Sequence, residues 1–184
     1  MVALYNMIAN LFWSVLNLLP ISVFCYNLMN LKLFYVFLGI SLLTIFLPKS
    51  FFDNIQLGTS TPIYKKIGVN LINKFTQNGS IINTLIRKKN PQYKVVSYRP
   101  LSVKKLLNQT YVFEKFHFLM FLFFTLTTVY ALMKNYLIWA LIISVTNLVY
   151  NVYPGFLQQY IRVKLTSAAK KWNNILWILF ICYQ

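Results

Sequence analysis

The chain has 184 residues, of which 58% are hydrophobic and only 11% are charged. Soluble domains carry about 25% charged residues, so this composition excludes an ordinary soluble protein and predicts an integral membrane protein. Its 18 Lys and Arg residues outnumber its 2 Asp and Glu residues, which gives a formal net charge of +16. A nucleic-acid-binding protein would be polar around its basic patch. Here the cations lie between apolar runs, so we expect membrane lipids with anionic headgroups as partners, and no nucleic acid.

Four apolar runs predict about four transmembrane helices, and therefore an all-α membrane protein with a single domain over residues 1–184. A span needs about 20 apolar residues, or about 17 at the short end. Pro20 falls inside the first run, where transmembrane helices tolerate proline. The second run is marginal in length and is followed by Pro48. The predicted spans are 8–26, 30–47, 114–133 and 136–157.

The distribution of cations predicts the orientation of these spans. Residues 1–31 contain no charged side chain, and the short connections after the first and third spans contain only Lys32 and Lys134. Most other cations lie in the central segment 49–110 or after the fourth span. Because cytoplasmic segments are enriched in Lys and Arg, both termini are predicted inside, in a bacterial inner membrane or, alternatively, a mitochondrial inner membrane. The last apolar run, within 172–184, is too short to cross and is predicted to be interfacial.

The central segment 49–110 is predicted to be a basic inner loop of amphipathic helices. Ser60-Thr-Pro is typical of a helix start. Apolar residues at helical spacing predict helices over 69–75, 81–86 and 101–107. Two interpretations remain open. The helices lie on the inner leaflet with their cations at the headgroups, or they form a lid or acyl-chain groove over a site at the membrane edge.

The only histidine of the chain, His117, and one of its two acids, Glu114, lie three residues apart at the start of the third span. On a helix, this spacing lets the two side chains touch. A carboxylate beside an imidazole orients the ring and raises its basicity, as a general base requires. The alternative is an ordinary helix start in which Glu114 pairs with a nearby cation. A di-iron carboxylate site would need a second Glu-x-x-His motif and more acids, so no metal site is predicted.

A second polar motif ends the fourth span. Residues 151–165 read Asn-Val-Tyr-Pro-Gly-Phe-Leu-Gln-Gln-Tyr-Ile-Arg-Val-Lys-Leu, so apolar side chains give way to amides, a tyrosine and two cations. A helix that ends in this way places hydrogen-bonding groups and positive charge at the membrane edge, where they can meet an anionic group. The candidate binding residues are Asn151, Gln158, Tyr160, Arg162 and Lys164.

Together, the two motifs resemble the glycosyl-4,4'-diaponeurosporenoate acyltransferase family of small bacterial membrane proteins. The likeness covers roughly residues 64–165, and a weaker counterpart of the family's basic-aromatic-glycine stretch lies at Tyr64-Lys-Lys-Ile-Gly68. One departure is Gln159, which stands where the family usually has an arginine, and Lys164 also replaces an arginine. The positions that match the family's motifs are Glu114, His117, Asn151, Gln158, Tyr160, Arg162 and Lys164.

The resemblance implies an acyltransferase that moves a fatty acyl group to a hydroxyl of a glycosylated lipid or carotenoid-like acceptor at the inner leaflet. It would use no cofactor, with an acyl thioester such as acyl-CoA as co-substrate. His117, steered by Glu114, would deprotonate the hydroxyl. Asn151 and Gln158 would donate hydrogen bonds to the acyl carbonyl oxygen, while Arg162 and Lys164 would hold the donor's phosphates.

A non-catalytic role is the alternative. Few acids together with many Phe, Tyr, Asn and Lys residues are also typical of an organelle-encoded membrane subunit of a larger, for example respiratory, complex. Such a subunit would pack its spans on partner subunits and use its basic loop to bind cardiolipin.

Overall fold

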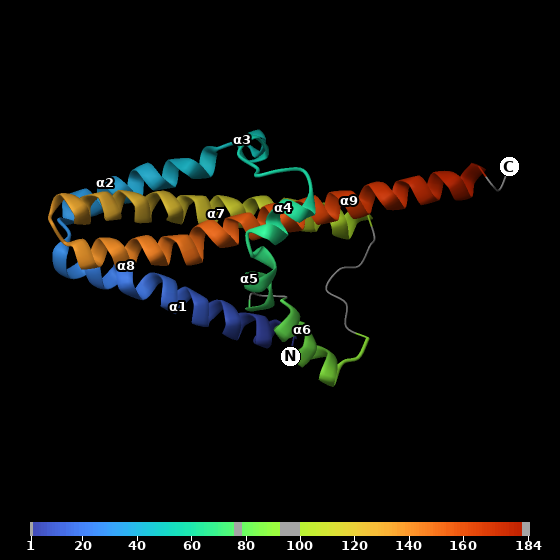
Figure 1. The fold of residues 1–184 in the computed structure, drawn as a ribbon, viewed down its shortest axis with the longest axis horizontal. Coiled ribbons are helices and arrows are strands. Elements are labelled where there is room, and N and C mark those ends of the chain that lie inside the picture. Colours follow the sequence, from blue (N-terminus) through green and yellow to red (C-terminus); the bar gives the residue numbers. More distant parts are fainter. Residues whose placement is uncertain (1, 76–78, 93–99, 182–184) are drawn as a thin grey trace.

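The computed structural model describes residues 2–75, 79–92 and 100–181, and every regular element in these ranges is a helix. The long helices form two antiparallel hairpins (Figure 1). The first hairpin consists of α1 (Val2–Leu28), α2 (Leu31–Leu42) and the 3-10 turn η1 (Leu43–Phe46). The second consists of α7 (Pro100–Met133) and α8 (Leu137–Asn147), and the π-helical turn η2 (Leu148–Val152) joins α8 to α9 (Tyr153–Ile181). The all-α prediction is confirmed.

Three helical stretches are long and apolar enough to cross a membrane: Asn10–Leu28, Val103–Met133 and Leu137–Ala169. The stretch Leu31–Phe46, which corresponds to the marginal second run, is apolar but shorter. Both long helices of the second hairpin extend beyond their predicted spans. The α7 helix begins at Pro100, where a proline suits the first turn, and no helix breaker follows before Glu114. The backbone of the predicted interfacial segment continues α9 as far as Ile181.

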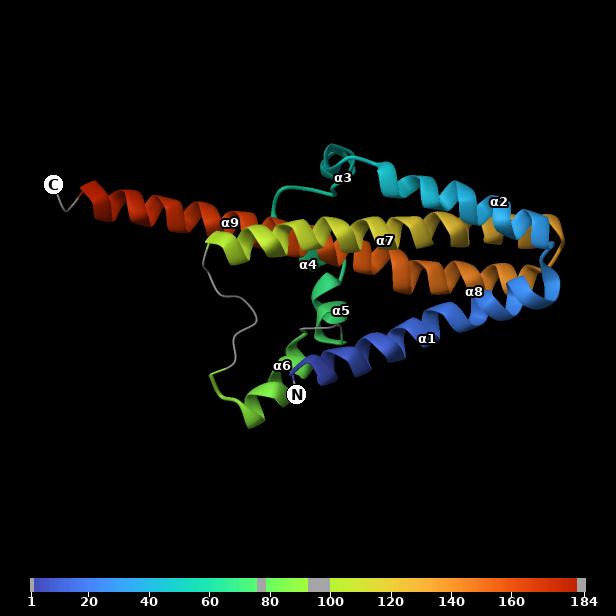
Figure 2. The same ribbon diagram turned by 180° about the vertical axis from the view of Figure 1, so that it is seen from behind.

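An asparagine shapes each hairpin turn. The side chain of Asn30 caps α2 by accepting a hydrogen bond from the Lys32 amide at 2.9 Å. Asn135 has a φ of 62°, a left-handed conformation that asparagine adopts more readily than most residues. Both turns lie at the same end of the bundle, on the right in Figure 2, and the central helices lie toward the other end.

Aromatic packing holds the two hairpins together near these turns. Phe24 of α1 is fully buried, and its ring lies 6.2 Å from Tyr130, 6.1 Å from Tyr136 and 5.7 Å from Trp139, measured between ring centroids. Phe34 of α2 meets Phe123 of α7 edge to face at 5.8 Å. Aromatic pairs in these geometries contribute beyond the area that they bury.

The central segment forms four short helices: α3 (Lys49–Asn54), α4 (Thr61–Lys66), α5 (Val69–Phe75) and α6 (Ser80–Lys89). The predicted helix start at Ser60-Thr-Pro and the helices over 69–75 and 81–86 are confirmed, with Ser60 as the N-cap residue of α4. The stretch 101–107 is also helical, and it forms the first turns of α7, which continue directly into the third predicted span. Gly68, with a φ of 82°, ends α4 in the left-handed conformation that favours glycine.

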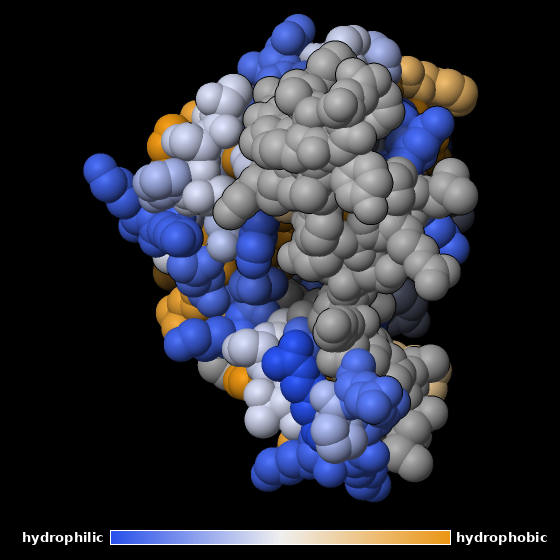
Figure 3. All heavy atoms as spheres, turned by 90° about the vertical axis from the view of Figure 1, so that its right-hand side faces the viewer, coloured by the Kyte–Doolittle hydropathy of each residue, from blue (hydrophilic) through white to orange (hydrophobic). Residues whose placement is uncertain are grey.

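The helices of the central segment cover one side of α9. Tyr64 of α4 and Val69 of α5 are fully buried in a cluster with Leu157, Tyr160 and Val163 of α9. At this end of the molecule, hydrophilic side chains gather on the surface (Figure 3). The exposed cations that the central segment and its neighbours contribute include Lys65, Lys66, Lys88, Lys89, Lys104, Lys105 and Lys164.

We expect Phe24→Ala to destabilise the bundle, because it leaves a cavity among three aromatic rings. Truncation of a buried phenylalanine costs about 3–5 kcal/mol in soluble cores. The free energy of unfolding, measured by SDS titration in mixed micelles, should fall by an amount of this order. Phe46→Ala is the control, since Phe46 is 83% exposed. Equal losses in the two variants would contradict the packing described here.

Candidate functional site

A buried ion pair joins α7 to α9 at the end opposite the hairpin turns. Glu114 Oε2 accepts a hydrogen bond from Arg162 Nη1, and Glu114 Oε1 accepts one from Gln159 Nε2 at 2.7 Å. The side chains of Arg162 and Glu114 are 5% and 4% exposed. Glu114 of the first polar motif and Gln159 and Arg162 of the second therefore face each other across α7 and α9.

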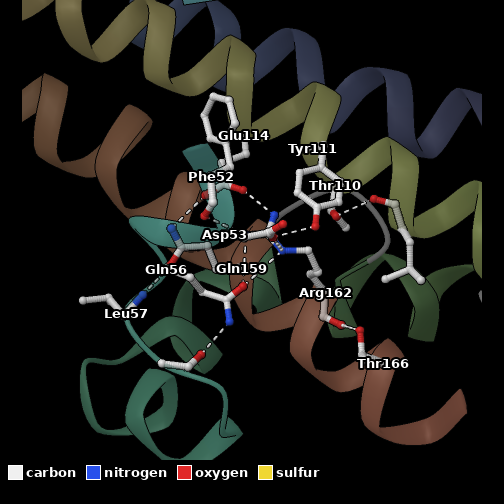
Figure 4. Close-up of polar contacts among 12 residues, drawn as sticks. Phe52, Asp53, Gln56, Leu57, Thr110, Tyr111, Glu114, Gln159, Arg162 and Thr166 are labelled. Carbon is white, nitrogen blue, oxygen red and sulfur yellow. Dashed lines mark hydrogen bonds and ion pairs between the residues drawn. The ribbon is translucent and has the colours of Figure 1, made fainter. Parts of the chain in front are cut away.

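The guanidinium of Arg162 also binds α3 and the residues after it (Figure 4). Nε and Nη2 donate to Gln56 Oε1 at 3.2 and 3.1 Å, and Nη2 donates to the Phe52 carbonyl at 3.3 Å. Asp53 Oδ1 lies 3.7 Å from Nε and accepts a bond from the Tyr111 hydroxyl at 2.6 Å. The guanidinium carbon lies 4.3 Å from the centre of the Tyr111 ring, a cation–π contact. Both acids of the chain thus lie against one arginine.

Gln159 connects this pair to the segment between α3 and α4. Its Oε1 atom accepts a hydrogen bond from the Leu57 amide at 3.2 Å and lies 3.3 Å from the Tyr64 hydroxyl. That hydroxyl also donates to the Gly58 carbonyl at 3.0 Å. Burial raises the pKa of Tyr64 above its ordinary value, so the phenol stays a neutral donor. The carboxamide of Gln159 therefore positions both the Glu114 side chain and the backbone between α3 and α4.

His117 does not pair with Glu114. The carboxylate of Glu114 is bound by Gln159 and Arg162, whereas the His117 ring lies near the backbone of Tyr150. The predicted contact between Glu114 and His117 is wrong, because a buried carboxylate is better satisfied by a guanidinium on the facing helix.

The imidazole of His117 lies near the backbone of Tyr150. Its Nδ1 atom is buried and has no hydrogen-bond partner. Tyr150 lies within η2, where Tyr153 N bonds to the Leu148 carbonyl in the π-helical pattern. Such π turns are frequent at functional sites.

Asn151 belongs to a line of amides between α7 and α8. Its Nδ2 atom donates to Asn147 Oδ1 at 2.9 Å. Asn147 Nδ2 in turn lies 3.2 Å from both the Phe121 carbonyl and Thr125 Oγ1. Asn151 is only 1% exposed, and its Oδ1 atom is buried without a partner.

The other predicted residues lie in three environments. Gln158 is half-buried. Tyr160 is buried and packs its ring 6.2 Å from that of Tyr64. Lys164 is exposed. Within the described residues, no group of three or more His, Cys, Asp or Glu side chains is arranged to hold a metal ion.

Sequence reasoning missed several members of the network, namely Asp53, Gln56, Tyr111 and Gln159. The scarcity of acids was the available signal. When a chain has only two carboxylates, an arginine at the end of one span is the expected partner of an acid at the start of the preceding span.

Removing both partners of the ion pair should cost less stability than the two single removals added together. We expect Glu114→Ala to lower the free energy of unfolding by about 3–5 kcal/mol, because Arg162 would remain as an uncompensated buried charge. The double variant Glu114→Leu/Arg162→Met should lose less than the sum of the two single changes in an SDS unfolding titration. Lys164→Ala, an exposed change on the same helix, should have an effect within about 0.5 kcal/mol. Additive losses would show that the two charges are not coupled.

Comparison with known proteins agrees with these motifs. Residues 48–171 match the model of the glycosyl-4,4'-diaponeurosporenoate acyltransferase family. The match contains α3, the central helices, α7, α8 and most of α9, and so the whole hydrogen-bonded site. Searches among curated proteins and among solved structures found no match. Because the match covers more than half of the chain, including both polar motifs, the chain belongs to the glycosyl-4,4'-diaponeurosporenoate acyltransferase family.

Proposed function

We propose that this protein is a membrane O-acyltransferase that moves a fatty acyl group from a thioester donor to a hydroxyl of a lipid-like, glycosylated acceptor. Family membership supports acyl transfer. The observation that carries the proposal is the Nδ1 atom of His117, the only histidine of the chain, which is buried and has no hydrogen-bond partner in the protein. An unpaired ring nitrogen is what a general base needs before a hydroxyl arrives.

The reaction needs only one proton shuttle. Nδ1 of His117 takes the proton from the acceptor hydroxyl while the oxygen attacks the carbonyl carbon of the thioester. The new C–O bond forms an ester, the C–S bond breaks, and the thiolate leaves with the proton that His117 returns. No electrons are exchanged with a cofactor, and atoms balance between alcohol plus thioester and ester plus thiol.

The structure changes which cations are suited to the donor. All three guanidinium nitrogens of Arg162 already donate to protein acceptors, so this residue serves the fold. Lys164, two residues away, is exposed and free to turn toward phosphates. We assign the phosphates of a donor such as acyl-CoA to Lys164 with Lys65 and Lys66 of α4, which packs beside α9. Gln158 keeps its proposed role as an amide donor to the carbonyl oxygen.

We also propose four spans with both termini inside, in a bacterial inner membrane. Two features support this orientation. The hairpin turns share one end of the bundle, and α3 to α6 lie toward the other end (Figures 1 and 2). The turns carry only Lys32 and Lys134, whereas most exposed cations belong to the other end, where anionic lipid headgroups would bind them.

His117→Ala should abolish acyl transfer without loss of the protein. Removal of a general base costs about 10²–10⁴-fold in rate, so we expect a fall of several hundred-fold or more. The assay is transfer of the palmitoyl group from palmitoyl-CoA to dodecyl glucoside by protein in lipid nanodiscs, followed by mass spectrometry. Phe116→Ala, at an adjacent exposed residue, is the control. Full turnover in the His117 variant would remove the general-base role, and a wild-type protein inactive with every donor would favour the non-catalytic alternative.

Cysteine labelling tests the orientation. In a background with Cys25→Ser and Cys182→Ser, Lys134→Cys should react with a membrane-impermeant maleimide on intact cells. Lys65→Cys should react only after the inner membrane is permeabilised. The reason is that the turn at Lys134 is placed outside and α4 inside. Labelling of Lys65→Cys on intact cells would mean that the orientation is reversed.

A further inference from the structure

The amide line between α7 and α8 consists of Asn151, Asn147 and Thr125, and it ends at the Phe121 carbonyl. This carbonyl determines which side-chain atoms along the line donate and which accept. The Phe121 carbonyl can only accept, so Asn147 must turn its NH₂ group toward it. The Thr125 hydroxyl gives its own proton to the same carbonyl at 2.7 Å, which leaves Thr125 Oγ1 as an acceptor for Asn147. Asn147 Oδ1 then faces Asn151 and requires a donor. Asn151 must therefore direct its NH₂ group at Asn147 Oδ1, which leaves its own Oδ1 atom without a partner.

Helix geometry places this oxygen level with His117. The α7 and α8 helices are antiparallel, and Asn147 contacts Phe121 and Thr125. One helical turn further from the hairpin, about 5.4 Å along the axis, His117 stands opposite Tyr150 and Asn151. The proximity of the His117 ring to the Tyr150 backbone agrees with this register.

Two buried atoms at this level, His117 Nδ1 and Asn151 Oδ1, are without a hydrogen-bond partner. Asn151 Oδ1 can only accept, and His117 Nδ1 accepts when it acts as the proposed base. A buried acceptor left unpaired is costly, so the two atoms suit a ligand that brings two donors. A single hydroxyl can give its proton to only one of them.

We propose that Asn151 binds a second hydroxyl of the acyl acceptor, next to the hydroxyl that His117 deprotonates. This inference rests on the proposed acyl transfer. Asn147 and Thr125 are then positioning residues, since they keep the oxygen of Asn151, and not its NH₂ group, toward the ligand. The role differs from the carbonyl-stabilising role predicted from the sequence, because the Asn151 NH₂ group already donates to Asn147. The ligand class is a lipid-linked polyol with neighbouring hydroxyls.

The test compares dodecyl glucoside with its single-deoxy analogues as acceptors of the palmitoyl group in nanodiscs. The wild type should prefer the parent over at least one deoxy analogue by about 10- to 100-fold in kcat/KM, the effect expected for leaving one buried acceptor unpaired. In Asn151→Leu, the ratio of kcat/KM for the parent to kcat/KM for that analogue should fall toward one. Thr125→Val should weaken the preference. Thr127→Val is the matched control, because Thr127 also donates to a carbonyl four residues earlier, at 2.8 Å, and contacts no part of the amide line in the described bonds.

A binding measurement separates this inference from the proposed reaction. His117 is the only histidine, so protein labelled with ¹⁵N-histidine gives one imidazole. Dodecyl glucoside should shift the Nδ1 resonance of the wild type and of Thr127→Val, and should shift it much less in Asn151→Leu. If these shifts are observed but no acyl transfer is detected, the proposed reaction is contradicted while the proposed hydroxyl-binding site stands. Turnover with equal selectivity in the wild type and Asn151→Leu would overturn the inference. An Nδ1 resonance that is hydrogen-bonded in lipid alone and unchanged by the glucoside would indicate bound water and would also overturn it.

Discussion

The ion pair between Glu114 and Arg162 is the constraint on which the end of the bundle with the central helices depends. Two buried charges are tolerated here because further partners bind both groups: Gln159 donates to Glu114, while Gln56 and the Phe52 carbonyl accept from Arg162. Those partners come from α3, the segment that follows it and α9 itself. The pair therefore fixes where the chain leaves the first hairpin and how the central helices cover α9. Because the chain has only two acids and both lie against Arg162, no other described arginine or lysine has an acid available for this role.

Under the proposed acyl transfer, structural and chemical roles are divided between neighbouring residues of α7. Both oxygens of Glu114 are bound, by Gln159 and Arg162, whereas His117, less than one turn further, lies near the backbone of the π turn with its Nδ1 atom unpaired. The chain therefore needs no further buried carboxylate in a region already dependent on one arginine. In the proposed reaction, this division lets a protein with a single histidine and two acids both hold its fold and present a base.

Hydropathy and turn chemistry predicted most of the fold, because both are local. The three long apolar helices, the helix start at Ser60 and the helices over 69–75 and 81–86 follow from residue spacing alone. The partners of Glu114 and the surroundings of His117 did not follow, since helix spacing shows which side chains can touch on one helix and says nothing of the facing helix. The π turn at Leu148–Val152 has no composition signature. The amide line was visible in part, as Asn147 and Asn151 lie four residues apart, but its direction depends on a carbonyl of α7.

Gln159 shows how one position can change the chemistry of the site without changing its architecture. Its NH₂ group donates to Glu114, while its oxygen accepts from the Leu57 amide and lies beside the Tyr64 hydroxyl. The arginine that is usual here in the family offers donors only. An arginine in this chain could bind Glu114, but it would leave the Leu57 amide without its acceptor and would crowd a second cation against Arg162. Gln159 therefore suits a site in which Glu114 already neutralises Arg162 and a second cation is not needed. The segment that contains Leu57 and Tyr64 depends on a side chain that can both donate and accept hydrogen bonds.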